Sequence, residues 1–384
     1  MKVVKKSNKI NVRNMTETKN NSSDKEVKVF KDLFETIIHP GLCCSCGACV
    51  AYCESQGFNV IKMEGYKPRY KSPETVENCT ECGLCYFICP QTDTIQERMN
   101  NFYQIKDELG YVKDILAAKT TEKAIEEVGQ DGGVVTTILS HLFDKHMIDA
   151  AIVSQYDVNF NTIPKIIYDK DDLLKSSGTR YSISSQILPL KDLYNLSLEI
   201  IEKKGIFDIE QLRLAFIGTP CQTRAIEKMR FLHVKPAHVI KYSISLFCFE
   251  NFDYEKLYKI LKDETNVEAK NIKKTWIKKN FFLKNKEDKE FEVDIKKLDS
   301  AVRNHCHVCD EFTGRFSDIS VGATGAPSGY SMIITRNEKA HNLISSLLSE
   351  GLIEQYLVPV EKTKEWKEKK ITWLKKMVSL KTKK

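Results

Sequence analysis

The sequence lacks the long apolar segments of membrane and secreted proteins. No run approaches the ~20 consecutive apolar residues that a membrane-spanning helix needs, and the N-terminus has no apolar core of a secretory signal. Hydrophobic residues still make up 42% of the 384 residues, enough for the cores of two or three domains. These features predict a soluble cytoplasmic protein that associates with a membrane at most peripherally, through a partner.

Motifs for nucleotide cofactors are missing as well. The chain contains neither the G-x-G-x-x-G fingerprint of dinucleotide-binding folds nor a phosphate-binding P-loop. The motifs therefore do not indicate an enzyme that uses nicotinamide cofactors or nucleoside triphosphates.

Excess positive charge is confined to the two ends. The net charge is +7, yet residues 1–28 carry eight basic and three acidic residues and residues 361–384 carry ten and three, so the part between them is acidic. A basic end can bind nucleic acid, an anionic membrane or an acidic partner, but it is more often only a solvated tail. Because no nucleic-acid-binding motif accompanies these ends, we expect no nucleic-acid binding.

Cysteine is abundant, but its distribution is not that of a disulfide framework. The 13 cysteines gather at the short spacings of metal ligands. Eight of them form two copies of the pattern C-x2-C-x2-C-x3-C, which is the bacterial ferredoxin pattern. Free thiolates and clusters require a reducing compartment, which agrees with a cytoplasmic location.

In this pattern three thiolates on one short loop hold three irons of a [4Fe–4S] cube, and the fourth lies too far along and ligates the other cube. One cluster is therefore assigned to Cys43, Cys46, Cys49 and Cys89, and the second to Cys79, Cys82, Cys85 and Cys53. A pair of zinc knuckles is the alternative, which two complete runs disfavour. The repeat is imperfect because Glu54 stands where proline is usual, and Cys44, outside the spacing, is interpreted as a spare thiol.

Four cysteines remain later in the chain: Cys221, Cys248, Cys306 and Cys309. The first lies where a predicted strand turns into a helix, the second ends a strand, and the last two form a single C-x2-C. Spacing alone leaves three interpretations open. They could hold a third cluster, form a zinc site that recruits His305 or His307, or be buried core thiols.

Strands and helices alternate from about residue 130, which predicts an α+β chain with a mixed α/β body. The predicted strands are 149–153, 165–168, 212–217, 239–247, 319–322 and 332–335, with a hairpin within 275–297. The predicted helices are 132–143, 188–203, one from about 222, and 340–348. Nearer the N-terminus we expect a short helix at 30–38 and a hairpin around 63–70.

These patterns divide the chain into six parts. They are a disordered basic tail at 1–30, a ferredoxin-like domain with two [4Fe–4S] clusters at 31–98, a linker at 99–125, the two halves of the body at 126–205 and 206–360, and a basic amphipathic tail at 361–384.

Several stretches of the body match a known family in order. They are QDGGVVT at 130–136, SGTRY at 177–181, GTPCQ at 218–222, LFCFENF at 246–252, CHVCD at 306–310 with Phe312 and Thr313, DISVG at 318–322 and GAP at 325–327. The body thus resembles the beta subunits of coenzyme F420-reducing hydrogenases and F420H2 dehydrogenases. With its N-terminal domain, the chain resembles the F420H2-oxidising input subunit of archaeal respiratory complexes. It departs from the family at Arg180, Ser328 and Tyr330.

The resemblance implies that the four later cysteines ligate a third [4Fe–4S] cluster beside FAD. It also implies FAD-binding residues in two segments: Gln130, Asp131, Gly132, Gly133, Thr136, Gly178, Thr179, Arg180 and Tyr181. In the first segment glycines would let the backbone approach a flat ring and a helix N-terminus would offer N–H donors. The alternatives are an ordinary helix start capped by Asp131 and a surface turn at 178–181.

These cofactors together imply a function. A deazaflavin exchanges a hydride, clusters carry single electrons, and a flavin can do both. We expect an oxidoreductase that moves electrons between coenzyme F420 and a redox partner or larger complex through FAD and three [4Fe–4S] clusters, without a catalytic acid or base. The alternatives are a related flavin and iron–sulfur reductase with another substrate, as in the chlorophyll-reductase branch, and a flavin-free electron carrier.

The C-terminal tail carries Trp366, Trp373, Met377 and Leu380 at helical spacing among many lysines. A basic amphipathic helix of this kind suits an anionic membrane surface or an acidic partner subunit. The alternative is that its apolar stripe packs on the body.

Overall fold

The computed structural model describes residues 27–382 apart from residue 196. The disordered tail expected at 1–30 therefore lies almost entirely outside the described residues. Within the part of the chain that is described, no helix combines the length and the apolar character needed to cross a bilayer.

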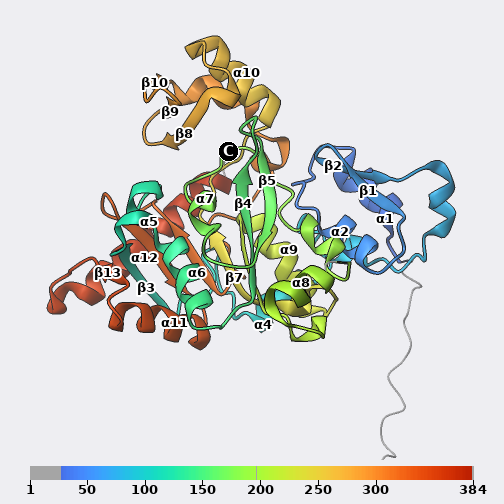
Figure 1. The fold of residues 1–384 in the computed structure, drawn as a ribbon, viewed down its shortest axis with the longest axis horizontal. Coiled ribbons are helices and arrows are strands. Elements are labelled where there is room, and N and C mark those ends of the chain that lie inside the picture. Colours follow the sequence, from blue (N-terminus) through green and yellow to red (C-terminus); the bar gives the residue numbers. More distant parts are fainter. Residues whose placement is uncertain (1–26, 196, 383–384) are drawn as a thin grey trace, which may run out of the picture.

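The N-terminal domain consists of short helices and one hairpin. Its elements are α1 Phe30–Leu33, the π-helical turn η1 Phe34–Ile38, α2 Ala48–Ser55, β1 Ile61–Glu64, β2 Lys67–Tyr70, the 3-10 helix η2 Pro73–Asn78 and α3 Leu84–Phe87. The helix predicted at 30–38 and the hairpin around 63–70 are confirmed, and Ile61 pairs with Tyr70 in an antiparallel ladder. The domain, blue in Figure 1, lies beside β5 at one side of the body.

The body is built on one mixed sheet. Its strands are β3 Asp114–Thr120, β4 Ala150–Tyr156, β5 Thr162–Ile167, β6 Leu214–Gly218, β7 Ile240–Leu246, β11 Ile319–Gly322, β12 Ser331–Thr335 and β13 Ile353–Gln355, in the order β13-β3-β12-β11-β7-β6-β4-β5. The neighbours β11, β7, β6 and β4 are parallel, and the outer pairs are antiparallel. The parallel strands end at one common edge, where open α/β sheets bind ligands.

Helices cover both faces of this sheet: α6 Val134–Asp144 and α11 Glu338–Ser349 on one, α9 Pro220–Phe231 and α12 Thr363–Thr382 on the other. Successive strand residues point to opposite faces. In β4, Ala151 and Val153 therefore belong to one core, and Ala150 and Ile152 to the other. The second core also contains Ala51, so it continues into the N-terminal domain.

The linker expected at 99–125 is wrong. It begins within α4 Gln96–Phe102, but residues 114–120 form β3, which pairs with β12 and β13 inside the sheet. α5 Lys123–Val128 follows. Residues 115–118 are buried without alternation, because this strand is covered on both faces, so the period of a half-buried strand is absent from the sequence. The body therefore begins before residue 126.

The predicted strands and helices from residue 130 onward are confirmed with one exception, the helix at 188–203. The structure has the 3-10 helix η3 Leu188–Asp192 there, and then the separate helix α8 Ser197–Lys204. Pro189 lies at the start of η3, which packs against α2 of the N-terminal domain. This contact between domains fixes a tight turn where the apolar spacing predicted a longer helix.

A second, smaller sheet lies beyond the end of β4 and β5, at the top of Figure 1. Its strands are β8 Ile272–Ile277, β9 Phe281–Asn285 and β10 Glu290–Val293, next to α10 Tyr254–Thr265. The hairpin predicted in this region is confirmed by the pairing of Lys284 with Glu290. The remaining short helices are α7 Leu173–Ser176, η4 Ile209–Gln211, η5 Ala237–Val239, η6 Ala269–Asn271, η7 Ile295–Ala301, η8 Asn304–Val308 and η9 Val360–Lys362.

The C-terminal segment forms a helix, as predicted, but not a separate tail. Leu374 and Val378 of α12 are buried in a core with residues of β3 and β12, and Trp366 and Met377 pack beside them. Of the predicted stripe, Trp366 and Met377 therefore pack on the body, as in the alternative interpretation, whereas Trp373 and Leu380 are 39% and 47% exposed. Docking of the chain onto a partner or membrane through this helix stays a prediction.

Candidate functional site

The two ferredoxin-type loops have the same local geometry. Gly47 and Gly83 take left-handed conformations, with φ of +86° and +70°, and each opens a helix that carries cysteines. Ser45 and Glu81, two residues before these glycines, also have positive φ. The two loops therefore share the same backbone turns as well as the same cysteine spacing.

The structure gathers the eight cysteines into the two predicted groups. One apolar cavity is lined by Cys43, Cys46, Cys49 and Cys89, here called the proximal site, and Cys44 lines the same cavity. Another is lined by Cys53, Cys79, Cys82 and Cys85, here called the distal site. In each group the fourth cysteine comes from the other repeat, so the crossed arrangement expected from the spacing is the one that the fold produces.

Buried thiols in these sites resist ionisation. Burial raises the pKa of Cys89 to about 12, and the nearby thiols of Cys43 and Cys85 act in the same direction. Burial likewise raises the pKa of Cys85 to about 12, with further contributions from Cys82 and Cys79. Such thiols become thiolates when cationic iron supplies the missing positive charge, so this donor set fits iron–sulfur clusters.

Two cations of the body hold the proximal site. The Lys228 ammonium of α9 is fully buried and donates a hydrogen bond of 2.6 Å to the carbonyl oxygen of Cys89. Arg303 donates hydrogen bonds to the carbonyl oxygen of Cys43, at 3.1 Å, and to Ser45 Oγ, at 2.7 Å. The proximal site is thus fixed to the body.

The four later cysteines line a single pocket in the body, and we call them the C-terminal cysteine site: Cys221, Cys248, Cys306 and Cys309. Cys221 lies in the first turn of α9, Cys248 follows β7, and the other two belong to η8 and the residue after it. Burial raises the pKa of Cys306 to about 12 and raises that of Cys248 as well. The donor set again fits a cluster.

The two histidines of the zinc alternative lie in different surroundings. His305 lines the same pocket, and burial, assisted by Arg303 and Lys381, lowers its pKa to about 3, so it is neutral. His307 is exposed. Only His305 could therefore join the cysteines as a ligand.

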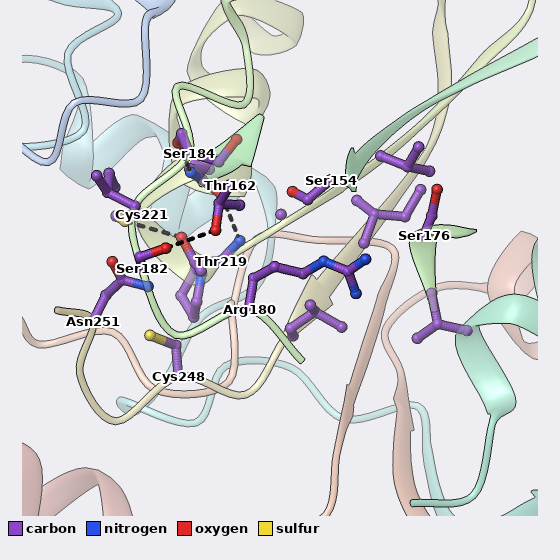
Figure 2. A pocket seen from close by; sticks show the side chains of 18 of the residues that line it. Ser154, Thr162, Ser176, Arg180, Ser182, Ser184, Thr219, Cys221, Cys248 and Asn251 are labelled. Atoms are coloured by element: carbon purple, nitrogen blue, oxygen red, sulfur yellow. Dashed lines mark hydrogen bonds between the residues drawn. The ribbon is translucent and has the colours of Figure 1, made fainter. Parts of the chain in front are cut away.

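The same pocket extends from the cysteines to a polar end. It opens at the carboxyl ends of β4, β6 and β7, where the topology predicts a ligand site. Figure 2 shows Cys221, Cys248 and Asn251 at one side, while Arg180 extends away from them toward Ser154 and Ser176. A single cavity thus joins a thiol-rich end to an end lined by hydroxyls and a cation.

Arg180 is the charged group of the polar end. Its Nη1 donates to the carbonyl oxygen of Gly178 at 2.7 Å and its Nη2 to that of Lys175 at 2.9 Å, and the guanidinium lies 4.7 Å from the centre of the Tyr156 ring. Burial lowers the pKa of Arg180. Its Nε is buried without a hydrogen-bond partner. A half-buried cation with an unused donor fits an anionic group, as the phosphates of FAD would provide.

Three of the nine predicted FAD residues line the pocket: Thr136, Gly178 and Arg180. Two others lie close to it but serve the fold. The carbonyl oxygen of Thr179 accepts a hydrogen bond from the Tyr156 hydroxyl, and the Tyr181 hydroxyl accepts one from the backbone N–H of Ile277.

The remaining four, Gln130, Asp131, Gly132 and Gly133, do not line this pocket in the described chain. A Cβ atom on Gly132 would lie 2.6 Å from the carbonyl oxygen of Ala118, so this glycine permits close packing on the sheet rather than approach of a flat ring. Burial raises the pKa of Asp131, against the effect of Lys274. Asp131 does not cap the helix either, because Gly133 occupies the cap position of α6.

Comparisons with known proteins bear on this arrangement. Residues 115–191 and 211–359 match the N-terminal and C-terminal parts of the family described as coenzyme F420 hydrogenase/dehydrogenase, beta subunit, and residues 8–95 match a 4Fe-4S dicluster domain. An uncharacterized protein of Methanocaldococcus jannaschii is 33% identical in an alignment of 378 positions that covers 90% of this chain and 98% of that relative. The chain belongs to the family of coenzyme F420 hydrogenase/dehydrogenase beta subunits.

Other relatives carry functional names. One subunit of the F420H2 dehydrogenase of Methanosarcina mazei is 29% identical over 79% of this chain and 81% of its own length. A coenzyme F420-dependent sulfite reductase of Methanocaldococcus jannaschii is 29% identical over 87% of this chain, which spans only 50% of that relative. A chain in the F420-reducing [NiFe] hydrogenase complex of Methanosarcina barkeri superposes with a TM-score of 0.61 and 27% identity over 73% of this chain and 91% of its own.

The predicted resemblance is therefore confirmed. The chain is an electron-transfer oxidoreductase of the F420-related family of beta subunits, with an N-terminal 4Fe-4S dicluster domain. The fold is α+β, as predicted.

Two residues of this family member were not recognised as part of the site from the sequence. Cys44, interpreted as a spare thiol, is buried, and its thiol interacts with those of Cys46 and Cys221. It therefore lies between the proximal site and the C-terminal cysteine site. Lys381 lines the pocket from the last turn of α12. The only signal for Cys44 was its position inside the motif, and Lys381 had none among the surrounding lysines.

Proposed function

We propose that this protein transfers electrons between coenzyme F420 and a partner protein through bound FAD and three [4Fe–4S] clusters. The observation that carries the proposal is the shared pocket, in which the C-terminal cysteine site and the polar end with Arg180 face one cavity. FAD, when bound, exchanges a hydride on one side and single electrons on the other.

The arrangement of the cysteines supports a route out of this pocket. The C-terminal cysteine site adjoins the proximal site through Cys44. The proximal site adjoins the distal site, because the Cys49 and Cys89 thiols interact with that of Cys85. The distal site reaches the surface, since Cys82 is exposed. A partner would therefore exchange electrons at the distal site, which is the last of the three cysteine sites counted from the pocket.

The residues of the chain have distinct tasks in this proposal. Arg180 and the hydroxyls of Ser154 and Ser176 would hold the anionic and polar parts of FAD, and the start of α9 would add backbone N–H donors. Iron, once bound, would keep the four thiols ionised, because its positive charge offsets the burial that raises their pKa. No described side chain is required to take up or release a proton during the transfer.

The test is an anaerobic assay of the purified full chain with reduced F420 and an artificial acceptor dye. We expect dye reduction together with the return of the absorbance of oxidised F420, and protein that contains flavin. Flavin-containing protein that leaves reduced F420 unchanged would indicate a related reductase with another substrate. Protein without flavin would indicate an electron carrier. Either result would overturn the proposal.

A further inference from the structure

Lys381 is a buried cation that reaches the C-terminal cysteine site from the far end of the chain. Only 2% of it is exposed. Its ammonium donates hydrogen bonds to the carbonyl oxygens of Cys248, at 2.7 Å, and of Glu311, at 2.5 Å. The Glu311 carbonyl oxygen also lies 3.6 Å from the Cys309 sulfur. The lysine thus holds two backbone segments that carry cysteines of this site.

The position of this ammonium is fixed by the helix behind it. Leu374, Val378 and Lys381 follow one another on one face of α12, and all three are buried. The first two pack against Ile115 and Ile334 of the sheet. The last turn of α12 therefore delivers the lysine into the pocket, and the long side chain has little freedom to leave it.

The four thiols of the C-terminal cysteine site line the same pocket as Lys381. Removing an ammonium from water is costly unless an opposite charge compensates it. Carbonyl oxygens offer only dipoles. A four-cysteine iron–sulfur cluster is anionic, and it gains a further negative charge on reduction, so it would supply the compensation.

A fixed cation beside a cluster favours the reduced, more negative state, because cluster potentials depend on net charge and on hydrogen bonds nearby. We propose that Lys381 is a positioning residue that raises the reduction potential of the cluster in the C-terminal cysteine site, and that α12 thereby belongs to the electron-transfer unit. This inference rests on the third cluster of the proposed function.

The experiment compares the full chain with three substitutions of one residue. Lys381→Gln removes the charge but keeps an N–H donor for the two carbonyl oxygens, Lys381→Met removes both, and Lys381→Arg keeps both. Lys376→Met, on the exposed face of the same helix, is the matched control. Each protein is titrated anaerobically with a redox mediator while the clusters are followed by electron paramagnetic resonance, and iron and flavin are counted.

We expect Lys381→Gln and Lys381→Met to lower the midpoint potential of one cluster and to leave the other two unchanged. Lys381→Arg should retain most of the wild-type potential, and Lys376→Met all of it. If Lys381→Gln keeps the wild-type potential, the lysine only ties the helix to the carbonyl oxygens and the inference is overturned, while the proposed function stands.

Other outcomes are equally decisive. Wild-type protein with iron for only two clusters would overturn the third cluster, and with it both proposals. If Lys381→Met loses the third cluster and Lys381→Gln keeps it, the hydrogen bonds to the two carbonyl oxygens, and not the charge, are needed to retain the cluster. In that case the potential of the Gln variant decides the inference.

Discussion

The ferredoxin sites and the C-terminal cysteine site bring their thiols together in different ways. In the first, eight of the nine cysteines between residues 43 and 89 follow the repeated spacing, on two loops with the same backbone turns. In the second, the cysteines come from the start of α9, the end of β7 and the turn around η8. The first arrangement is a property of local spacing, whereas the second depends on the whole sheet and on a lysine from the C-terminal helix.

This difference predicts different consequences of losing one ligand, which is the largest effect we expect. Cys309→Ala should reduce the iron content from about twelve to about eight per chain, because one of three four-iron clusters is lost. Reduced F420 should still reduce the flavin, but electrons should not reach an acceptor at the distal site. Anaerobic iron and sulfide analysis, together with rapid-mixing absorbance measurements, checks both parts.

Cys82→Ala is the matched variant from the distal site. It should also remove iron, but it should leave the flavin and the C-terminal cluster in contact, so that rapid reduction of that cluster persists. If Cys309→Ala delivers electrons to the acceptor at the wild-type rate, the route through the C-terminal cysteine site is wrong. Recovery of zinc in place of iron would favour the zinc alternatives.

The C-terminal cysteine site depends on elements far apart in the chain. A substitution in the core of α12 should therefore affect this site and not the ferredoxin sites. Leu374 is fully buried, so Leu374→Ala should lower the free energy of unfolding by about 2–5 kcal/mol. The C-terminal cluster should be lost before the ferredoxin clusters as urea is raised. Leu380, which is 47% exposed, provides the control, since Leu380→Ala should change stability by less than about 0.5 kcal/mol.

The measurement is anaerobic urea denaturation followed by circular dichroism and by cluster absorbance. Equal effects of the two alanine substitutions would mean that α12 is not part of the core. Simultaneous loss of all three clusters would mean that the two regions unfold as one unit and that the contrast between them does not extend to stability.

The sequence predicted the ferredoxin sites better than the pocket of the body. The crossed grouping of the eight ferredoxin cysteines was predicted because each loop fixes its own geometry. The pocket was predicted only in part. Thr136, Gly178 and Arg180 line it, but Gln130 to Gly133 do not, and Gly132 instead packs closely against β3 and β12. A glycine needed for close packing and a glycine needed for a ligand look alike in a sequence.

The fold was missed where burial or contacts between domains override local patterns. β3 has the sequence DILAAKT, which shows no alternation because both of its faces are covered. The helix expected at 188–203 is interrupted because η3 packs against α2, a contact that no local pattern contains. Lys381 is surrounded by lysines in the sequence, and only the packing of α12 distinguishes it from them.

The two ferredoxin repeats also differ from each other, at the position after the fourth cysteine. Pro90 follows Cys89, but Glu54 follows Cys53, and α2 continues to residue 55. The Glu54 carboxylate lies 3.1 Å from the ammonium of Lys71 and 3.4 Å from that of Lys191. The missing proline thus allows a longer helix and two ion pairs.

Restoring the proline tests this interpretation. Glu54→Pro should destabilise the protein by about 3 kcal/mol, because proline removes a hydrogen bond inside α2. Glu54→Gln should cost less than about 1 kcal/mol, since it removes only partly exposed ion pairs. Urea denaturation of both variants measures the difference. If Glu54→Pro leaves the free energy of unfolding unchanged, the two repeats are interchangeable at this position.

The polar end of the pocket predicts a further, smaller effect. Arg180→Met should weaken FAD binding by roughly tenfold or more, because a charge-assisted hydrogen bond contributes about 1.5–3 kcal/mol. Arg180→Lys should retain part of the affinity, since it keeps the charge. Flavin retained after gel filtration and titration of the flavin-free protein with FAD measure both. Unchanged affinity in Arg180→Met would place the flavin elsewhere, while the clusters would remain unaffected in either case.

The smallest effect concerns the junction between the two regions. Cys44 interacts with Cys46 of the proximal site and with Cys221 of the C-terminal cysteine site, and the equivalent position in the second repeat is Thr80. Thr80 is exposed whereas Cys44 is buried, so Cys44→Thr places a hydroxyl at the buried junction. We expect unchanged iron content, a loss of stability of about 1–3 kcal/mol for a buried hydroxyl, and slower reduction of the ferredoxin clusters after the C-terminal cluster has been reduced. Rapid-freeze electron paramagnetic resonance measures this step. A wild-type rate would mean that Cys44 only fills space at the junction, and a loss of iron would mean that it is a ligand rather than a spare thiol.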